Sequence, residues 1–450
     1  MTIRRTTLRV TQYPSLIVLG LTACGAFAVA CGSDGDDSAS PYAGSSNANG
    51  GRSGGGAGGQ HTGGTGAANN GHAGSAAQGG STAHAGSPGD AGSPGGAGSP
   101  GDAGSPGDAG NGGASGAEDH GDAGAAQLTE YAVKKTSLVS DQDNVATTKD
   151  TQLKNAWAIA INPTAQVFWL SSNHGGSTPV YGADGAIKPV DPTVAPVAGT
   201  DPGSPTGQVF NSGANFKGDK FIVDTEDGQI MGWAAGAAFT QRALSNTAIY
   251  KGLALVGTGA TQQLLAANFH DGSIDIFDTD YAVVAKPNAF KDPSIPAGFA
   301  PFNVVVIADQ VYVSYAKQDG DKEDDVAAPG NGYVSVFDVG GTLTKSWLAG
   351  GKLNSPWAIT RAPAGFGVPE TALLVGNFGD GWIRAYDVTS GELLGSLTDN
   401  AGTPLIIPGL WDLKVGPPGT TDLSNTLFFS AGPGGEAHGL FGKLEAAALQ

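Results

Sequence analysis

The sequence of 450 residues is poor in cysteine and in charge, and both shortages narrow the possible functions. Its two cysteines, Cys24 and Cys31, lie near the amino terminus, so residues 32–450 cannot form a disulfide or a metal–thiolate centre among themselves. Only 14% of the residues are charged, and acidic residues outnumber basic ones by 41 to 23. An acidic chain without a basic stripe is not expected to bind nucleic acid or an anionic membrane surface.

Several enzyme signatures are also missing. Residues 127–450 contain no Gly-x-Ser-x-Gly nucleophile motif and no phosphate-binding loop, which excludes the enzyme classes that depend on them. No internal run is long and apolar enough to be a transmembrane helix.

The first 31 residues have the layout of a bacterial lipoprotein signal. A basic start is followed by an apolar run from Leu16 to Ala30, and the chain then turns polar. Small residues precede both cysteines, as in a lipobox. Cys24 has the better local motif, whereas Cys31 opens directly into polar chain and is favoured here; an ordinary cleaved signal is the alternative. Residues 1–31 thus predict an exported cell-envelope lipoprotein, periplasmic or on the outer surface, that touches the membrane only through a lipid anchor.

Residues 32–126 are predicted to be a disordered linker. The hexapeptide Gly-Ser-Pro-Gly-Asp-Ala recurs here, and almost no aliphatic or aromatic side chain is larger than alanine. Such a chain cannot bury enough apolar area to offset its conformational entropy. Residues 127–450 carry all seven tryptophans and regular apolar segments, so they are predicted to form one domain. Its 19 basic and 32 acidic residues give a net charge of 19 − 32 = −13.

This domain contains six related segments. The strongest match pairs Asn-Phe-His-Asp-Gly-Ser-Ile-Asp-Ile-Phe-Asp at 268–278 with Asn-Phe-Gly-Asp-Gly-Trp-Ile-Arg-Ala-Tyr-Asp at 377–387. Weaker copies lie at 173–181, 224–233, 330–338 and 435–443. Two short apolar segments precede each copy. The first of these is anchored at intervals of 49, 45, 51, 55 and 54 residues on Trp157, Thr206, Lys251, Phe302, Trp357 and Trp411.

Each repeat is predicted to form three strands and a variable fourth one, without helical periodicity. Short strands with glycine-rich turns at this interval predict an all-β, six-bladed β-propeller. Because a ring must hide its first and last edges, residues 131–139 are expected to add the outer strand of the sixth blade, after 440–444. Trp157, Trp357 and Trp411 begin inner strands and are expected to pack between blades.

Several phrases occur in an order that resembles a known family. They include Thr-Glu-Asp-Gly at 225–228, Ala-Asn-Phe-His at 267–270, Pro-Phe-Asn at 301–303 and Leu-Val-Gly-Asn-Phe-Gly-Asp-Gly at 374–381. Together they resemble a family of exported bacterial proteins of unassigned function, some of which end in an exosortase sorting tail. The resemblance covers about residues 127–444. It implies an NHL-like propeller and implies no reaction.

The turns between the second and third strands of propeller blades open on one face, at the mouth of the channel. All three histidines of the domain fall in these turns, and the candidate catalytic residues there are His174, Glu226, His270, Glu436 and His438. Three imidazoles and a water can hold a catalytic zinc ion, so the three histidines form one candidate metal site. The alternative is that polar residues collect in turns and bond to neighbouring backbone.

Amide and carboxylate oxygens form a second candidate site at this face. The candidate ligand-binding residues are Asn173, Asn268, Asn303, Asn377 and Asp380. Together with Glu226 such oxygens suit calcium, in an arrangement similar to that of lactonase and paraoxonase-like propellers, whose own motifs are absent here. Alternatively, the asparagines close tight turns.

The long turn at residues 317–332 is strongly acidic. Its candidate calcium ligands are Asp319, Asp321, Asp324 and Asp325. Carboxylates this close repel each other unless they are solvated or neutralised. A solvated acidic loop is the alternative.

No catalytic constellation is complete, so the sequence favours binding over catalysis. We expect a surface-tethered monomer that binds or scaffolds an envelope protein, a glycan or a small molecule through its polar turns. The alternative is a metal-dependent hydrolase or lyase that holds calcium or zinc at the central channel.

Overall fold

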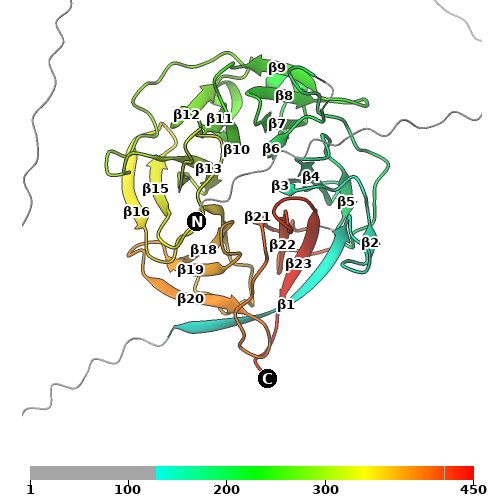
Figure 1. Ribbon diagram of the computed structural model, residues 1–450, viewed down its shortest axis with the longest axis vertical. Coiled ribbons are helices and arrows are strands. Elements are labelled where there is room, and N and C mark those ends of the chain that lie inside the picture. Colours follow the sequence, from blue (N-terminus) through cyan, green and yellow to red (C-terminus); the bar gives the residue numbers. More distant parts are fainter. Residues whose placement is uncertain (1–127, 200, 420) are drawn as a thin grey trace, which may run out of the picture. The chain divides into compact units, whose positions relative to one another are not determined.

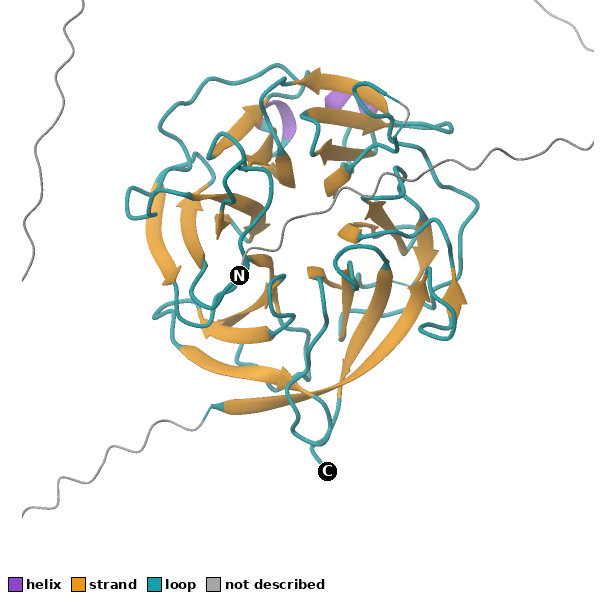
Figure 2. Cartoon of the chain, in the orientation of Figure 1, coloured by secondary structure: helices purple, strands orange, loops and turns teal. Residues whose placement is uncertain are grey.

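The computed structural model describes residues 128–199, 201–419 and 421–450. The predicted signal at 1–31, with Cys24 and Cys31, and the predicted linker at 32–126 lie outside these residues. The described part is all-β apart from two single 3-10 turns, η1 (Phe216–Gly218) and η2 (Gly259–Thr261) (Figure 2). None of its helices is long or apolar enough to cross a membrane.

The strands form five sheets that stand around one axis, as in a β-propeller (Figure 1). Four small sheets follow chain order: β3 (Ala156–Asn162), β4 (Val167–Ser172) and β5 (Val180–Gly182); β6 (Pro205–Phe210), β7 (Phe221–Thr225), β8 (Gln229–Trp233) and β9 (Thr240–Leu244); β10 (Tyr250–Val256), β11 (Gln263–Asn268) and β12 (Ser273–Phe277); β13 (Phe299–Ile307), β14 (Gln310–Lys317), β15 (Gly332–Asp338) and β16 (Leu343–Ala349). The predicted fourth strand is present in the second and fourth of them. In the other two, isolated bridges join Tyr181 to Ile187 and Phe277 to Val283.

The fifth sheet has nine strands and closes the ring. Its order is β17 (Pro356–Arg361), β18 (Ala372–Asn377), β19 (Ile383–Asp387), β20 (Leu393–Thr398), β1 (Thr129–Ser140), β23 (Leu440–Ala446), β22 (Thr426–Ala431) and β21 (Leu410–Val415), with β2 (Thr148–Lys149) beside β1.

The predicted closing strand is confirmed. Strand β1 pairs antiparallel with β23, from Val133 opposite Ala446 to Ser140 opposite Leu440. The sequence did not indicate that the start of β1 also pairs in parallel with β20, where Thr129 lies opposite Gly395. One strand therefore joins the last two repeats into a single sheet and covers an edge of each.

The innermost strand of every repeat contains the same irregularity. The pairing register between first and second strands breaks at Ala156/Ile159, Pro205/Gln208, Tyr250/Leu253, Pro301/Asn303, Pro356/Ala358 and Leu410/Leu413. Each break contains one of the anchor residues found in the sequence. A bulge bends the strand and redirects its side chains, so these six positions leave the ordinary alternation of a flat sheet.

Large aromatic side chains from different repeats pack against each other near the centre of the ring. This axial aromatic cluster consists of Trp157, Phe269, Phe302, Trp357, Phe378 and Trp411. Trp411 stacks on Trp157, with ring centroids 3.5 Å apart, and on Phe378 at 4.0 Å. It also meets Phe302, which comes from a repeat that is not adjacent along the chain. The prediction that the tryptophans pack between blades is confirmed, because Trp157 and Trp411 come from the first and last repeats and Trp357, from the fifth, meets Trp411 edge to face.

Small residues let the inner strands approach each other next to this cluster. A Cβ atom at Gly252 would lie 2.3 Å from Oδ1 of Asn303 on the neighbouring inner strand. Asn303 in turn donates from Nδ2 to the Trp357 carbonyl at 2.9 Å. Glycine at 252 is thus required for the contact that links three repeats near the axis.

We expect Trp411→Ala to destabilise the domain more than any substitution of a peripheral tryptophan. Removing a buried indole costs about 3–5 kcal/mol of unfolding free energy, because contacts and transfer energy are lost together. Trp382→Ala is the control, since this ring is half-buried and packs beside the Arg384 guanidinium, 4.4 Å from the ring centre. Urea unfolding monitored by circular dichroism would measure both. Equal losses would contradict a central role for the axial aromatic cluster.

Candidate functional site

The polar turns lie at the end of the ring where the inner strands begin. The last residue of β11, Asn268, pairs with the first of β10, Tyr250, and Asn377 pairs in the same way with Pro356. We call this end the polar-turn face; it comprises the turns at 173–176, 226–228, 269–272, 318–331, 378–382 and 432–439.

A chain of hydrogen bonds connects several repeats across this face. Asn155 Nδ2 donates to Glu436 Oε2 at 2.8 Å and to Asn173 Oδ1 at 3.1 Å. Asn173 Nδ2 donates to Glu226 Oε2 at 2.9 Å. Lys251 Nζ continues the chain, because it binds Glu226 Oε1 and lies 3.5 Å from Asp324 Oδ1. We call Asn155, Asn173, Glu226, Lys251, Asp324 and Glu436 the mouth cluster.

Lys251, like Asn155, is a member of the cluster that the sequence analysis did not single out as a site residue. Its side chain is only 3% exposed, and its ammonium lies 5.3 Å from the ring centre of Trp157. Burial alone would lower the pKa of Lys251, but the carboxylates of Glu226 and Asp324 outweigh burial and raise it. A signal was present in the sequence: Lys251 is the only charged residue among the six repeat anchors.

Two glutamates of the cluster have pKa values that move in opposite directions. Burial disfavours ionisation of Glu226, but the Lys251 ammonium and the hydrogen bonds from Lys251 and Asn173 outweigh it and lower its pKa. Burial raises the pKa of Glu436 to about 7, and the nearby charge of Glu226 adds to the effect. Glu226 is therefore the charged partner of the lysine, while Glu436 takes up a proton near neutral pH.

The acidic loop does not direct all its carboxylates to one point. Asp324 reaches inward to Lys251, whereas Asp319 accepts a hydrogen bond from the backbone N–H of Glu323 at 3.0 Å. Asp321 is exposed. Burial raises the pKa of Asp325, which opposes its ionisation.

The three candidate histidines each have a different carboxylate neighbour. His270 Nδ1 lies 3.1 Å from Asp271, and His438 Nδ1 lies 2.9 Å from Asp141. His174 is exposed and acts electrostatically on Glu226. Among residues 128–199, 201–419 and 421–450, no group of three or more His, Cys, Asp or Glu is arranged to hold a metal ion.

Asp141 is another residue that the sequence analysis missed. Its buried carboxylate binds Lys154, His438 and the backbone N–H of Gly439. Burial opposes its ionisation, but these hydrogen bonds outweigh burial and lower its pKa. Asp141 directly follows β1, so this contact fastens the closing strand to the turn that carries Glu436.

The remaining candidate ligand-binding residues hold their own turns or strands. Asn268 Nδ2 donates to Asp271 and Asp275, both at 3.0 Å. Asn377 Nδ2 donates to the Lys352 carbonyl at 2.9 Å, and Asp380 accepts from the N–H of Trp382 at 3.1 Å. Asn303 links inner strands, as described above. Of the five predicted residues, the structure brings only Asn173 into the mouth cluster.

Two viral proteins are similar to this chain. The uncharacterised protein R648 of Acanthamoeba polyphaga mimivirus is 31% identical over 326 residues, which cover 68% of this chain and 78% of the relative. The uncharacterised protein L690 of the same virus is 30% identical over 330 residues, 69% of this chain and 85% of the relative. No protein-family model matches the sequence. The resemblance to exported bacterial proteins therefore stays a prediction.

Solved structures give weaker similarities. An α-L-arabinofuranosidase of Fusarium graminearum, in complex with an iminosugar inhibitor, has a TM-score of 0.45 and 12% identity, covering 70% of this chain and 98% of the other. A chain of a nidogen–laminin complex has a TM-score of 0.38 and 13% identity, covering 58% and 84%. Similarity at this level says nothing about the activity of this chain.

The opposed pKa values predict opposite effects of two matched substitutions. Ionised Glu436 destabilises the fold increasingly as pH rises from about 4.5 to about 7, so Glu436→Gln should raise the melting temperature at pH 8 and not at pH 4. Because the pKa of Glu226 is lowered in the fold, its ionised carboxylate stabilises the fold at pH values above its ordinary pKa. Glu226→Gln should therefore lower the melting temperature at pH 8, and this loss should fade in acid. Melting curves at both pH values measure this. Shifts of the same sign at pH 8 would contradict the assignment.

Proposed function

From the premise that this chain belongs to the family of the mimivirus proteins R648 and L690, we propose that it is a six-bladed β-propeller that binds a ligand at its polar-turn face. The blade count rests on dividing the nine-stranded sheet into β17–β20 and β21–β23, with β1 completing the latter. Together with the four smaller sheets this makes six units around the axis (Figure 1).

The observation that carries the proposal is the convergence of the mouth cluster. Its side chains come from the repeats that contain β3, β6, β10, β13 and β21, and a single network joins them. Carboxylates from separate parts of the chain repel each other unless cations neutralise them. Lys251 is the one cation within the cluster, against the carboxylates of Glu226, Asp324 and Glu436.

This excess of acceptors indicates what the ligand must supply. The amide and ammonium donors of Asn155, Asn173 and Lys251 already bind within the cluster, so further interactions there fall to carboxylate oxygens. Carboxylates accept hydrogen bonds and favour positive charge. The ligand is therefore a molecule with amine groups, either a small polyamine or a lysine-rich segment of a partner protein.

The metal-dependent hydrolase is less well supported, since the described histidines each have a separate carboxylate neighbour.

Titration with spermidine tests the binding site. At pH 8, where Glu436 is ionised, we expect isothermal calorimetry to show binding to the full chain, and the double variant Asp324→Asn, Glu436→Gln to bind at least about a hundredfold more weakly. Charge-assisted hydrogen bonds contribute about 1.5–3 kcal/mol each, and 1.4 kcal/mol corresponds to tenfold in affinity. Glu445→Gln, at a half-buried position near the end of β23, is the control and should bind like the parent. Absence of binding, or equal affinity of the double variant, would remove the polar-turn face as the site.

We also propose that residues 1–31 export the protein and that 32–126 tether the domain to the cell envelope. The support is the lipobox-like sequence before Cys24 and Cys31 and the composition of the linker. Mass spectrometry of the mature amino terminus is expected to find an acylated cysteine, with Cys31 favoured. An unacylated terminus at any other residue would refute the anchor.

A further inference from the structure

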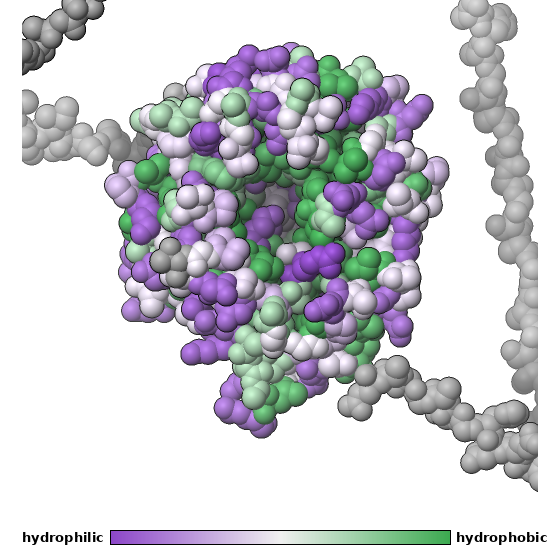
Figure 3. All heavy atoms as spheres, turned by 180° about the vertical axis from the view of Figure 1, so that it is seen from behind, coloured by the Kyte–Doolittle hydropathy of each residue, from purple (hydrophilic) through white to green (hydrophobic). Residues whose placement is uncertain are grey.

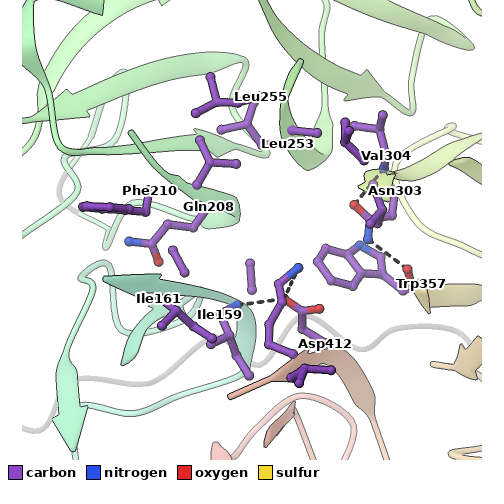
Figure 4. A pocket seen from close by; sticks show the side chains of 18 of the residues that line it. Ile159, Ile161, Gln208, Phe210, Leu253, Leu255, Asn303, Val304, Trp357 and Asp412 are labelled. Carbon is purple, nitrogen blue, oxygen red and sulfur yellow. Dashed lines mark hydrogen bonds and ion pairs between the residues drawn. The ribbon is translucent and has the colours of Figure 1, made fainter. Parts of the chain in front are cut away.

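A cavity of about 450 Å³ lies in the channel, toward the end opposite the polar turns. Its walls are the later residues of the inner strands and of the links that follow them, including Ile161, Phe210, Leu255 and Val306 (Figure 4). The face seen in Figure 3 is hollowed at its centre, and hydrophobic residues gather around the hollow. Cavities of about 300–1,000 Å³ are typical of small-molecule sites.

The cavity is separate from the mouth cluster. Trp357 lines its inner end and also belongs to the axial aromatic cluster. Trp357 Nε1 donates to the Lys251 carbonyl at 2.9 Å, and none of the mouth-cluster residues lines the cavity. A ligand in the cavity would therefore not compete with a ligand at the mouth cluster.

Most polar groups of the cavity wall already have partners. Asn303 uses Nδ2 for the Trp357 carbonyl and Oδ1 for the N–H of Val304. Asp412 accepts from the N–H of Ile159 at 3.0 Å and pairs with Lys414 at 3.3 Å. Because the charges of Asp412 and Lys414 offset each other, the cavity favours a neutral ligand over an ion.

Gln208 is the exception on this wall. The residue is 4% exposed, and its Oε1 accepts a long hydrogen bond from Ser171 Oγ at 3.4 Å. Among the residues that the structure describes, its Nε2 has no hydrogen-bond partner, and it is buried, so a bound molecule meets it once the amide has rotated toward the channel. Figure 4 shows this amide between Phe210 and Ile161, two other lining residues. An unpaired buried donor is costly, and an acceptor oxygen on a bound molecule would satisfy it.

We propose that this cavity is a second binding site, which takes a small, neutral, mostly apolar molecule and recognises one carbonyl oxygen through Gln208 Nε2. The apolar wall supplies burial for the body of the molecule, and the ring of Trp357 supplies an aromatic surface at the inner end. The amide supplies orientation, because its Nε2 donor lacks a partner among the described residues.

Acetophenone and ethylbenzene are matched probes, since they differ in the carbonyl oxygen and are otherwise similar in shape. We expect calorimetry on the full chain to show acetophenone binding at least tenfold more tightly than ethylbenzene. Gln208→Leu should abolish this preference by weakening acetophenone about tenfold without weakening ethylbenzene. Gln241→Leu, the same substitution at an exposed position of β9, is the control and should keep the preference.

A second variant tests the location independently of Gln208. Leu255→Trp adds bulk at a half-buried position of the wall and should prevent both probes from binding, while circular dichroism and melting confirm that the variant folds. The proposal is overturned if neither probe binds the parent chain, if Gln208→Leu keeps the preference, or if Leu255→Trp still binds. None of these results depends on spermidine binding, so the two sites can fail separately.

Discussion

The structure depends on a break in strand pairing that recurs near the start of every inner strand. Each break frees one anchor residue from the alternation of its sheet and directs it toward the axis. Large aromatic rings occupy most of these positions, and their mutual stacking around Trp411 fills the space that sheets standing in a ring would otherwise leave open. The same six positions therefore set both the packing at the axis and the direction of the inner strands.

The axial aromatic cluster also divides the channel chemically. Lys251 occupies an anchor position, and its ammonium meets both the ring of Trp157 and the carboxylates of the polar-turn face. Beyond Trp357 the channel is lined by aliphatic side chains and has few polar groups. Trp357 belongs to the axial aromatic cluster and also lines this cavity, whereas the charged network of the polar-turn face does not reach it.

Ring closure and the mouth cluster are mechanically connected. Strand β1 covers edges of two repeats, and Asp141, which directly follows it, binds the turn that carries Glu436 through His438 and Gly439. The same turn reaches Asn155, which links Glu436 to the rest of the network. Asp141, near the start of the domain, therefore helps to position Glu436, which lies close to its end.

The sequence by itself determined the repeats, their strands, the closing strand and the face on which polar residues gather, because these follow from local spacing and alternation. It also pointed to Asn173, Glu226 and Glu436. Only the tertiary structure decided which turn residues meet: Lys251, Asn155 and Asp141 act through partners far away in the chain, and the register breaks that aim the tryptophans inward leave no local pattern. Contacts across the axis depend on how the sheets close into a ring, and the spacing of residues within one repeat does not determine that closure.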